Sequence, residues 1–264
     1  MDFRLYRLYG LFILALLSGS FFLVLPVQSA TVGKSVNGQS SLKTGLVGWW
    51  TFDGADVTAT KVIDKSGQGN TGTRTGGVAM ASGKIGQAGK FDGVDDYVDV
   101  GNVLNFERTD SFSIGAWVKT TDTDGMIVGK MGGSPYTGYL LYNTGNKLTF
   151  YLINNYTSSN YLSTAETGTG AISNGVWHYT VVTYNGTSLV SGVKIYVDGI
   201  LLPTTTILDS LTSSVITSQN FRIGERTDNT LALIGLIDDT RVYNRALSAQ
   251  EIKQLYQMGG GKIA

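Results

Sequence analysis

Acidic side chains come first among the residues that could do chemistry, because a pair of carboxylates can cleave a glycosidic bond. The chain has four glutamates, no two of which lie close in sequence: Glu107, Glu166, Glu225 and Glu251. Adjacent aspartates at 95–96 and 238–239 could substitute. Neighbouring residues on a strand point to opposite faces, however, so such a pair does not converge on one bond. The sequence therefore favours a non-catalytic protein.

The single histidine, His178, offers little further chemistry. One imidazole cannot supply the three or four ligands of a zinc site by itself. The surrounding segment 176–182 has the pattern of an ordinary strand and lacks the G-x-S-x-G nucleophile elbow. We therefore predict a structural role for His178.

Aspartates in predicted loops could bind calcium, which prefers carboxylate and carbonyl oxygens. Asp53 ends the first predicted strand, Asp64 begins a polar turn, and Asp238 and Asp239 lie in a motif near the C-terminus. Aspartate is also common in turns that hold no metal, so this alternative stays open. Because the chain has no cysteine, a bound cation would supply a cross-link that disulfides do not.

Four tyrosines beside amide and hydroxyl side chains are candidate ligand-binding residues. Tyr136 and Tyr139 lie in the segment 135–139, and Tyr156 and Tyr161 in the segment 154–161. A sugar has an apolar face and polar edges, so a flat ring with hydrogen-bonding neighbours suits it. Exposed tyrosine also suits a protein partner, and tyrosine is common inside β-proteins. The loop-like composition favours binding by Tyr136 and Tyr156, whereas strand partners would bury Tyr139 and Tyr161.

Short apolar runs with a period of two predict the strands that position these side chains. In the segment 112–119, alternate residues place Phe112, Ile114, Ala116 and Val118 on one face, which predicts contact with a core. Turn signals lie at 124–125, 174–175, 185–186 and 198–199. The pattern predicts an all-β fold, a two-sheet antiparallel sandwich of the jelly-roll type. The other predicted strands are Leu46–Phe52, Tyr97–Val100, Met126–Lys130, Tyr139–Tyr142, Leu148–Ile153, Val176–Tyr184, Val193–Val197, Phe221–Ile223 and Leu233–Val242.

One short α-helix is predicted near the C-terminus. Ser248 and Glu251 have the spacing of a capping box, and Leu247 and Ile252 have that of a hydrophobic staple. Gly259 is the expected left-handed stop. Such a short helix is marginal alone, so we expect it to dock on the sandwich.

Six motifs follow one another along most of the chain: 45–53 (GLVGWWTFD), 91–98 (FDGVDDYV), 111–118 (SFSIGAWV), 176–179 (VWHY), 196–199 (YVDG) and 235–248 (GLIDDTRVYNRALS). Together they resemble the LamG-like jelly-roll domains of the concanavalin A-like lectin and glucanase superfamily. The resemblance implies two sheets packed face to face and a role in glycan binding, in adhesion or beside an enzyme. It also implies that a calcium ion would join the N-terminal region to the last strands, near Asp53, Asp64, Asp238 and Asp239.

The first 30 residues differ from the rest. Arg4 and Arg7 precede an interrupted apolar run at 11–25, and small residues precede Thr31, which together indicate a secretory signal peptide. An uncleaved anchor is the alternative, although the run is short for a bilayer span. We expect a signal peptide at 1–30, a flexible linker at 31–44, the jelly-roll domain at 45–258 and a tail at 259–264. The mature protein would have no membrane span and would be secreted, at the cell surface or periplasmic.

The charge balance limits the classes of partner that the sequence indicates. Lysine plus arginine and aspartate plus glutamate both number 20, so no basic surplus indicates nucleic acid. The sequence thus predicts a non-catalytic binding module for a glycan or another cell-surface polymer, with calcium as the candidate cofactor. Two alternatives remain: a glycoside hydrolase or lyase on the same fold, and a structural or adhesion domain that binds protein.

Overall fold

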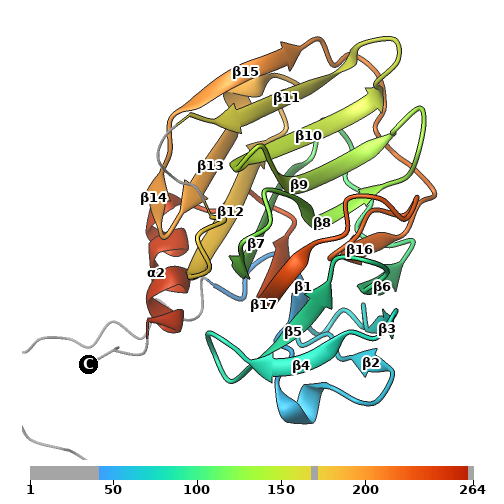
Figure 1. The fold of residues 1–264 in the computed structure, drawn as a ribbon. Helices are drawn as coiled ribbons and strands as arrows, with labels where there is room; N and C mark the ends of the chain where they lie inside the picture. Colours follow the sequence, from blue (N-terminus) through green and yellow to red (C-terminus); the bar gives the residue numbers. More distant parts are fainter. Residues whose placement is uncertain (1–41, 168–171, 261–264) are drawn as a thin grey trace, which may run out of the picture. The chain divides into compact units, whose positions relative to one another are not determined.

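A computed structural model describes residues 42–167 and 172–260 of the protein. These residues form two antiparallel β-sheets with one α-helix against the first sheet (Figure 1). The predicted all-β sandwich is confirmed. The predicted signal peptide, most of the predicted linker and residues 261–264 of the predicted tail lie outside the described residues.

The first sheet has eight strands, and the longest two lie side by side at its centre. In spatial order the strands are β14 (Ile200–Leu201), β13 (Val193–Val197), β12 (Trp177–Asn185), β7 (Ser111–Thr120), β17 (Ile234–Tyr243), β5 (Gln87–Asp92) and β4 (Ala79–Ser82), and β1 (Leu46–Trp50) also pairs with β17. Two short 3-10 helices, η1 (Gly54–Asp56) and η2 (Val190–Gly192), lie in the connections.

The second sheet has nine strands and carries the surface described below. In spatial order they are β15 (Thr204–Asp209), β11 (Asn160–Glu166), β10 (Lys147–Asn155), β9 (Gly138–Thr144), β8 (Asp124–Met131), β16 (Phe221–Ile223), β6 (Tyr97–Gly101), β3 (Gly72–Thr75) and β2 (Lys61–Val62). The strands β8 to β11 follow one another in both sequence and space, which is a meander built from hairpins.

The main core lies between the sheets. On β7 the alternation predicted from sequence is confirmed, since Phe112, Ile114, Ala116 and Val118 are fully buried there. The second sheet contributes the alternate residues of its own strands, including Leu141, Phe150 and Leu162. Burying one large apolar side chain contributes about 1.5–3 kcal/mol, so this layer of side chains is the main source of stability.

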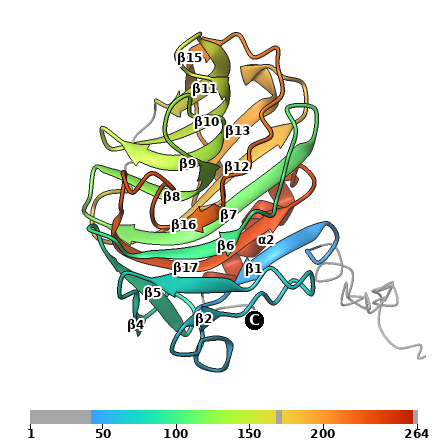
Figure 2. The same cartoon turned by 90° about the vertical axis from the view of Figure 1, so that its right-hand side faces the viewer.

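The helix α2 (Ala249–Gly259) covers the opposite face of β7, as predicted (Figure 2). The Ser248 hydroxyl accepts from the Glu251 amide and the Glu251 carboxylate accepts from the Ser248 amide, which completes the predicted capping box. The predicted left-handed stop at Gly259 is wrong, because Gly259 is the last helical residue. A Cβ added there would lie 2.3 Å from the Trp117 indole, so glycine permits the helix to pack closely on that ring. Among the described residues no helix is long and apolar enough to cross a bilayer.

Two turn predictions had opposite outcomes. Asp198 and Gly199 have positive φ values of 53° and 77° and join β13 to β14, as predicted. The turn predicted at 124–125 is wrong, because these residues begin β8. A Cβ added at Gly125 would lie 2.9 Å from the Leu233 Cα, so this glycine marks a close approach of two chain segments.

Candidate ligand-binding site

A cavity of about 300 Å³ opens on the face of the second sheet that points away from the main core. This volume is at the lower end of the range for small-ligand sites. Side chains from β8, β9 and β10 form its floor, and loops at the strand ends form its rim. The lining consists of Asp124, Met131, Tyr136, Leu140, Tyr142, Thr144, Tyr151, Ile153, Tyr156, Arg226 and Leu231.

The period of two along each strand decides which side chains reach the cavity. On β9, Leu140 and Tyr142 line the cavity, whereas the alternate residues, Tyr139 and Leu141, point into the core. Tyr139 is therefore a core residue, only 1% exposed, and does not line this cavity. Its hydroxyl donates to the Leu104 carbonyl at 2.8 Å, and its ring lies 5.4 Å from that of Phe112.

Two loops bring Tyr136 and Tyr156 together at the rim. The Tyr156 amide donates to the Pro135 carbonyl at 2.9 Å, and the Thr137 hydroxyl donates to the Asn154 carbonyl at 2.7 Å. The two tyrosine rings meet edge to face, with centroids 5.7 Å apart and an interplanar angle of 83°. Tyr156 is 45% exposed, so one side of its ring remains open to a ligand. The structure thus brings these two sequence-predicted residues into one site.

A row of tyrosines extends from this rim across the sheet. Tyr161 stacks on Tyr156 with centroids 5.0 Å apart, but it is only 9% exposed and supports the rim from behind. Tyr151 lies 5.8 Å from Tyr142 and 5.7 Å from Tyr161. Burial, reinforced by neighbouring tyrosines, raises the pKa of Tyr142 and of Tyr161. Their hydroxyls therefore stay neutral at physiological pH and can both donate and accept hydrogen bonds.

An arginine held in a fixed plane completes the rim. Arg226 donates through Nε and Nη2 to the two carboxylate oxygens of Asp228, at 2.8 and 2.9 Å, and through Nη2 to the Thr230 hydroxyl at 2.6 Å. Its guanidinium lies 4.9 Å from the centre of the Tyr136 ring. Burial opposes ionisation of Asp228, but these hydrogen bonds lower the pKa of Asp228 overall. A bidentate pair of this kind fixes the orientation of the guanidinium.

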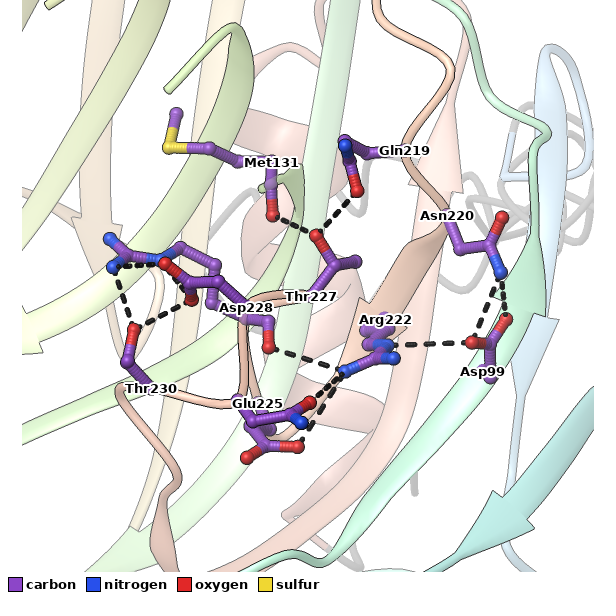
Figure 3. Close-up of polar contacts among 11 residues, drawn as sticks. Asp99, Met131, Gln219, Asn220, Arg222, Glu225, Thr227, Asp228 and Thr230 are labelled. Atoms are coloured by element: carbon purple, nitrogen blue, oxygen red, sulfur yellow. Dashed lines mark hydrogen bonds and ion pairs between the residues drawn. The ribbon is translucent and has the colours of Figure 1, made fainter. Parts of the chain in front are cut away.

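The loop that carries Arg226 is itself anchored, as Figure 3 shows. The Thr227 hydroxyl donates to the Met131 carbonyl at 2.7 Å, which ties the loop to β8. Arg222, on β16, lies between Asp99 and Glu225, with nitrogen–oxygen distances of 3.4 and 3.6 Å. The cavity is therefore bounded by strands on one side and by a braced loop on the other.

The side chains that line this cavity are mostly aromatic and apolar, with few charged groups. Among the described residues that line it, Asp124 is the one carboxylate. Glycoside hydrolysis needs two carboxyl groups that flank the bond. His178 lies outside the lining and bonds through Nδ1 to Asp198 at 2.8 Å, which ties β12 to the β13–β14 hairpin. This contact agrees with the structural role predicted for it.

Two of the predicted calcium ligands hold the turn between β4 and β5. The Asp238 Oδ2 atom accepts from the Lys84 and Ile85 amides at 2.9 and 2.8 Å. The Asp53 Oδ1 atom accepts from the Gln87 amide at 2.7 Å. Both carboxylates therefore act as acceptors for backbone amides of one hairpin.

The other two predicted ligands are also engaged by donors. Asp239 accepts from the Trp49 indole and from Arg241. Asp64 accepts from the Trp49 amide at 3.0 Å and from the Ser66 amide at 2.8 Å. Donors engage both oxygens of Asp239 and of Asp64, whereas the Asp238 Oδ1 atom has no partner among the described residues. Because Arg241 already supplies a positive charge beside Asp239, the arrangement does not fit one cation shared by all four aspartates. Calcium at these residues stays a prediction.

Sequence reasoning missed several residues of the cavity. Tyr151 could have been predicted, because the alternation in 148–153 places it on the face of the strand opposite to that of Phe150, a core residue. Tyr142 follows from the same rule on β9. Arg226 could not, because it belongs to a loop whose return to β8 depends on long-range contacts.

Comparisons with known proteins agree with this architecture. The family model described as the concanavalin A-like lectin/glucanases superfamily matches residues 92–253. A comparison with curated protein sequences finds no match.

Three solved structures show the same fold. The binding domain of Paraclostridial Mosquitocidal Protein 1 has a TM-score of 0.65 at 16% identity, over 82% of this chain and 53% of that one. The botulinum neurotoxin serotype D ligand binding domain in complex with N-acetylneuraminic acid has a TM-score of 0.61 at 17% identity, over 84% and 52%. Domain 4 of AbnA, a GH43 extracellular arabinanase from Geobacillus stearothermophilus in complex with arabinotriose, has a TM-score of 0.54 at 21% identity, over 80% and 98%. This chain thus spans about half the length of the toxin domains.

Proposed function

Because this chain belongs to the concanavalin A-like lectin/glucanase superfamily, we propose that it is a non-catalytic module that binds carbohydrate in the tyrosine-lined cavity. The observation that carries the proposal is the exposed ring of Tyr156 beside Tyr136, with Arg226 and Asp124 in the same lining. Ring faces suit the apolar face of a sugar, and the charged groups and tyrosine hydroxyls suit its hydroxyls.

The charges of the lining favour a neutral sugar. Asp228 neutralises Arg226, and Asp124 adds a negative charge to the cavity. A carboxylate on the ligand would meet this charge without a free cation among the described lining residues. Of the sugars bound by the structural relatives, arabinotriose is neutral and N-acetylneuraminic acid is anionic. We therefore propose a neutral oligosaccharide as the ligand class.

Calorimetric titration of the full chain with arabinotriose and other neutral oligosaccharides tests this proposal, with N-acetylneuraminic acid as the anionic comparison. Tyr156→Ala and Tyr136→Ala should each weaken binding by about 1–2 kcal/mol, or five- to thirtyfold, because each removes a ring face. Leu201→Ala, an equally exposed apolar residue on β14, is the matched control and should leave binding unchanged. Unchanged affinity in both tyrosine variants would refute the site.

The two alternatives give different results in the same preparation. A glycoside hydrolase or lyase would release shorter sugars, which chromatography of the incubated oligosaccharide detects. A protein-binding domain would give no heat with any sugar, and a partner retained by the wild type would be lost with Tyr156→Ala, since tyrosine and arginine are also enriched at protein interfaces.

We also propose that the protein acts outside the cytoplasm, on the pattern of residues 1–30. Mass spectrometry of the protein recovered from its native host should then find Thr31 as the first residue. Recovery of an intact N-terminus in the cell interior would contradict export.

A further inference from the structure

Three carboxylates meet in the turn between β5 and β6, outside the lining of the cavity. Asp92, Asp95 and Asp96 each place one carboxylate oxygen within 4.8 Å of the other two. Asp92 and Asp95 are exposed, whereas Asp96 is only 5% exposed. Calcium takes six to eight oxygen ligands from carboxylates, carbonyls and water, and a mixed wet and buried cluster can supply them.

The buried member of this cluster has an oxygen without a partner among the residues that the structure describes. Asp96 Oδ2 accepts from the Asp92 amide at 3.0 Å, but the buried Oδ1 atom has no hydrogen-bond partner. Leaving a buried charged acceptor unpaired is costly. Gly77 approaches this oxygen without a side chain of its own, since a Cβ added at Gly77 would lie 3.5 Å from it.

A second buried carboxylate without a hydrogen bond, that of Glu225, lies on the loop after β16 and is not one of the three that meet. Glu225 is fully buried, and neither of its oxygens has a hydrogen bond. Its ion pair with Arg222 is long, at 3.6 Å, and Arg222 is shared with Asp99 (Figure 3). The preceding residue packs on the cluster, since a Cβ added at Gly224 would lie 3.3 Å from the Asp96 carbonyl oxygen.

The electrostatics of these groups are consistent with one shared negative site. Burial raises the pKa of Asp96, and the charges of Asp92 and Asp95 add to the effect, although the hydrogen bond from the Asp92 amide and the charge of Arg74 oppose it. Burial likewise raises the pKa of Glu225, and Asp95 and Asp96 contribute although Arg222 opposes them. Asp92, Asp95 and Asp96 thus lie within electrostatic reach of one another, and Arg74 offsets the upward shift in the pKa of Asp96 only in part.

We propose that Asp92, Asp95 and Asp96 bind a divalent hard cation, with calcium as the best match. This site differs from the one predicted from sequence, whose aspartates accept from amides, the Trp49 indole and Arg241. The cation would hold the β5–β6 turn, against which the loop that begins at Gly224 packs. That loop also carries Arg226 and Leu231 of the cavity lining.

Calcium titration of the full chain tests the site, by calorimetry and by thermal melting in calcium and in chelator. The wild type should bind one ion, and its Tm should rise by about 5–10 °C at a hundredfold excess over Kd. Asp95→Asn and Asp96→Asn should each weaken calcium binding at least tenfold. Asp95 is exposed, so its variant should fold even if the Asp96 variant does not. Asp238→Asn is the matched control and should bind calcium as the wild type does.

Three outcomes would overturn the proposal. The wild type could show neither heat nor a Tm shift in 10 mM calcium. The shift could persist unchanged in Asp95→Asn. It could instead disappear only in Asp238→Asn, which would place the ion at the sequence-predicted aspartates. None of these outcomes involves a sugar, so each is separate from the test of the cavity.

Discussion

Asp238 is a buried carboxylate whose protonation should control stability between pH 5 and pH 8. It is 0% exposed, and its Oδ1 atom has no hydrogen-bond partner. Its burial, opposed by the Lys84 and Ile85 amides but reinforced by Asp239, raises the pKa of Asp238 from 3.8 to about 7. Between pH 5 and about pH 7 the folded protein therefore keeps a proton that the unfolded chain has already released.

The sign and size of the effect follow from that difference in pKa. The stabilisation is fully present below pH 3.8 and is lost as the pH rises through 7. Each unit between the two pKa values corresponds to about 1.4 kcal/mol. Lowering the pH from 8 to 5 should thus raise the free energy of unfolding by about 2.5 kcal/mol through Asp238 alone, or about 5–10 °C in Tm.

Urea denaturation of the full chain and its Asp238→Asn variant at pH 5, 6, 7 and 8 measures this effect in the presence of chelator. Asparagine keeps an acceptor for the two amides and does not titrate. The variant should be the more stable protein at pH 8, and its advantage should shrink by about 2.5 kcal/mol at pH 5. Subtracting the two proteins cancels the other groups that titrate. A difference that stays flat with pH would refute the argument, because it would mean that Asp238 keeps one protonation state throughout.

Two further predictions concern the C-terminal helix. Gly259→Ala should lower the free energy of unfolding by about 1–3 kcal/mol in urea melts, because its Cβ would collide with Trp117, whereas the control Gly260→Ala, with its nearest contact at 3.3 Å, should be nearly neutral; equal losses would contradict the packing account. Glu251→Gln should cost about 1 kcal/mol at pH 7. The hydrogen bond from Arg245, despite partial burial, lowers the pKa of Glu251 to about 2, so this loss should be complete above pH 4.5 and fade as the pH falls to 2. A loss of stability in Glu251→Gln that does not change with pH would contradict the lowered pKa of Glu251.

Much of the fold could be predicted because burial imposes short-range patterns. The alternation on β7 and the capping box at Ser248 each depend on residues a few positions apart. The missed strands lack such a pattern. β15 (Thr204–Asp209) is almost wholly exposed and begins with three successive threonines. No alternation of apolar residues therefore marks it as a strand. Its place in the sheet follows only from pairing with β11, which a single sequence does not reveal.

The predicted site was less complete, because loops and strand faces determine it together. Tyr136 and Tyr156 were predicted from the composition of their loops. Their contact, however, depends on a hydrogen bond from the Tyr156 amide to the Pro135 carbonyl, which the composition does not reveal. Tyr139 lies close to Tyr136 in sequence and was a candidate with it. On β9, however, Tyr139 points into the core, and the next residue, Leu140, points to the cavity. The sequence could not show which donors the carboxylates would meet. Asp238 Oδ2 accepts from two backbone amides of a distant hairpin, and calcium at this residue stays a prediction.

The loop that follows β16 connects the two proposed sites. Gly224 packs against the backbone of Asp96, and Arg226, two residues further on, lines the cavity, so a short stretch of chain separates the acidic turn from the guanidinium at the rim. Without a cation, Asp92 and Asp95 repel the buried Asp96 in the turn against which this loop packs. A cation would remove that repulsion without touching the sugar. Because coupling between two sites is reciprocal, sugar affinity should then rise with calcium by the same factor as calcium affinity rises with sugar.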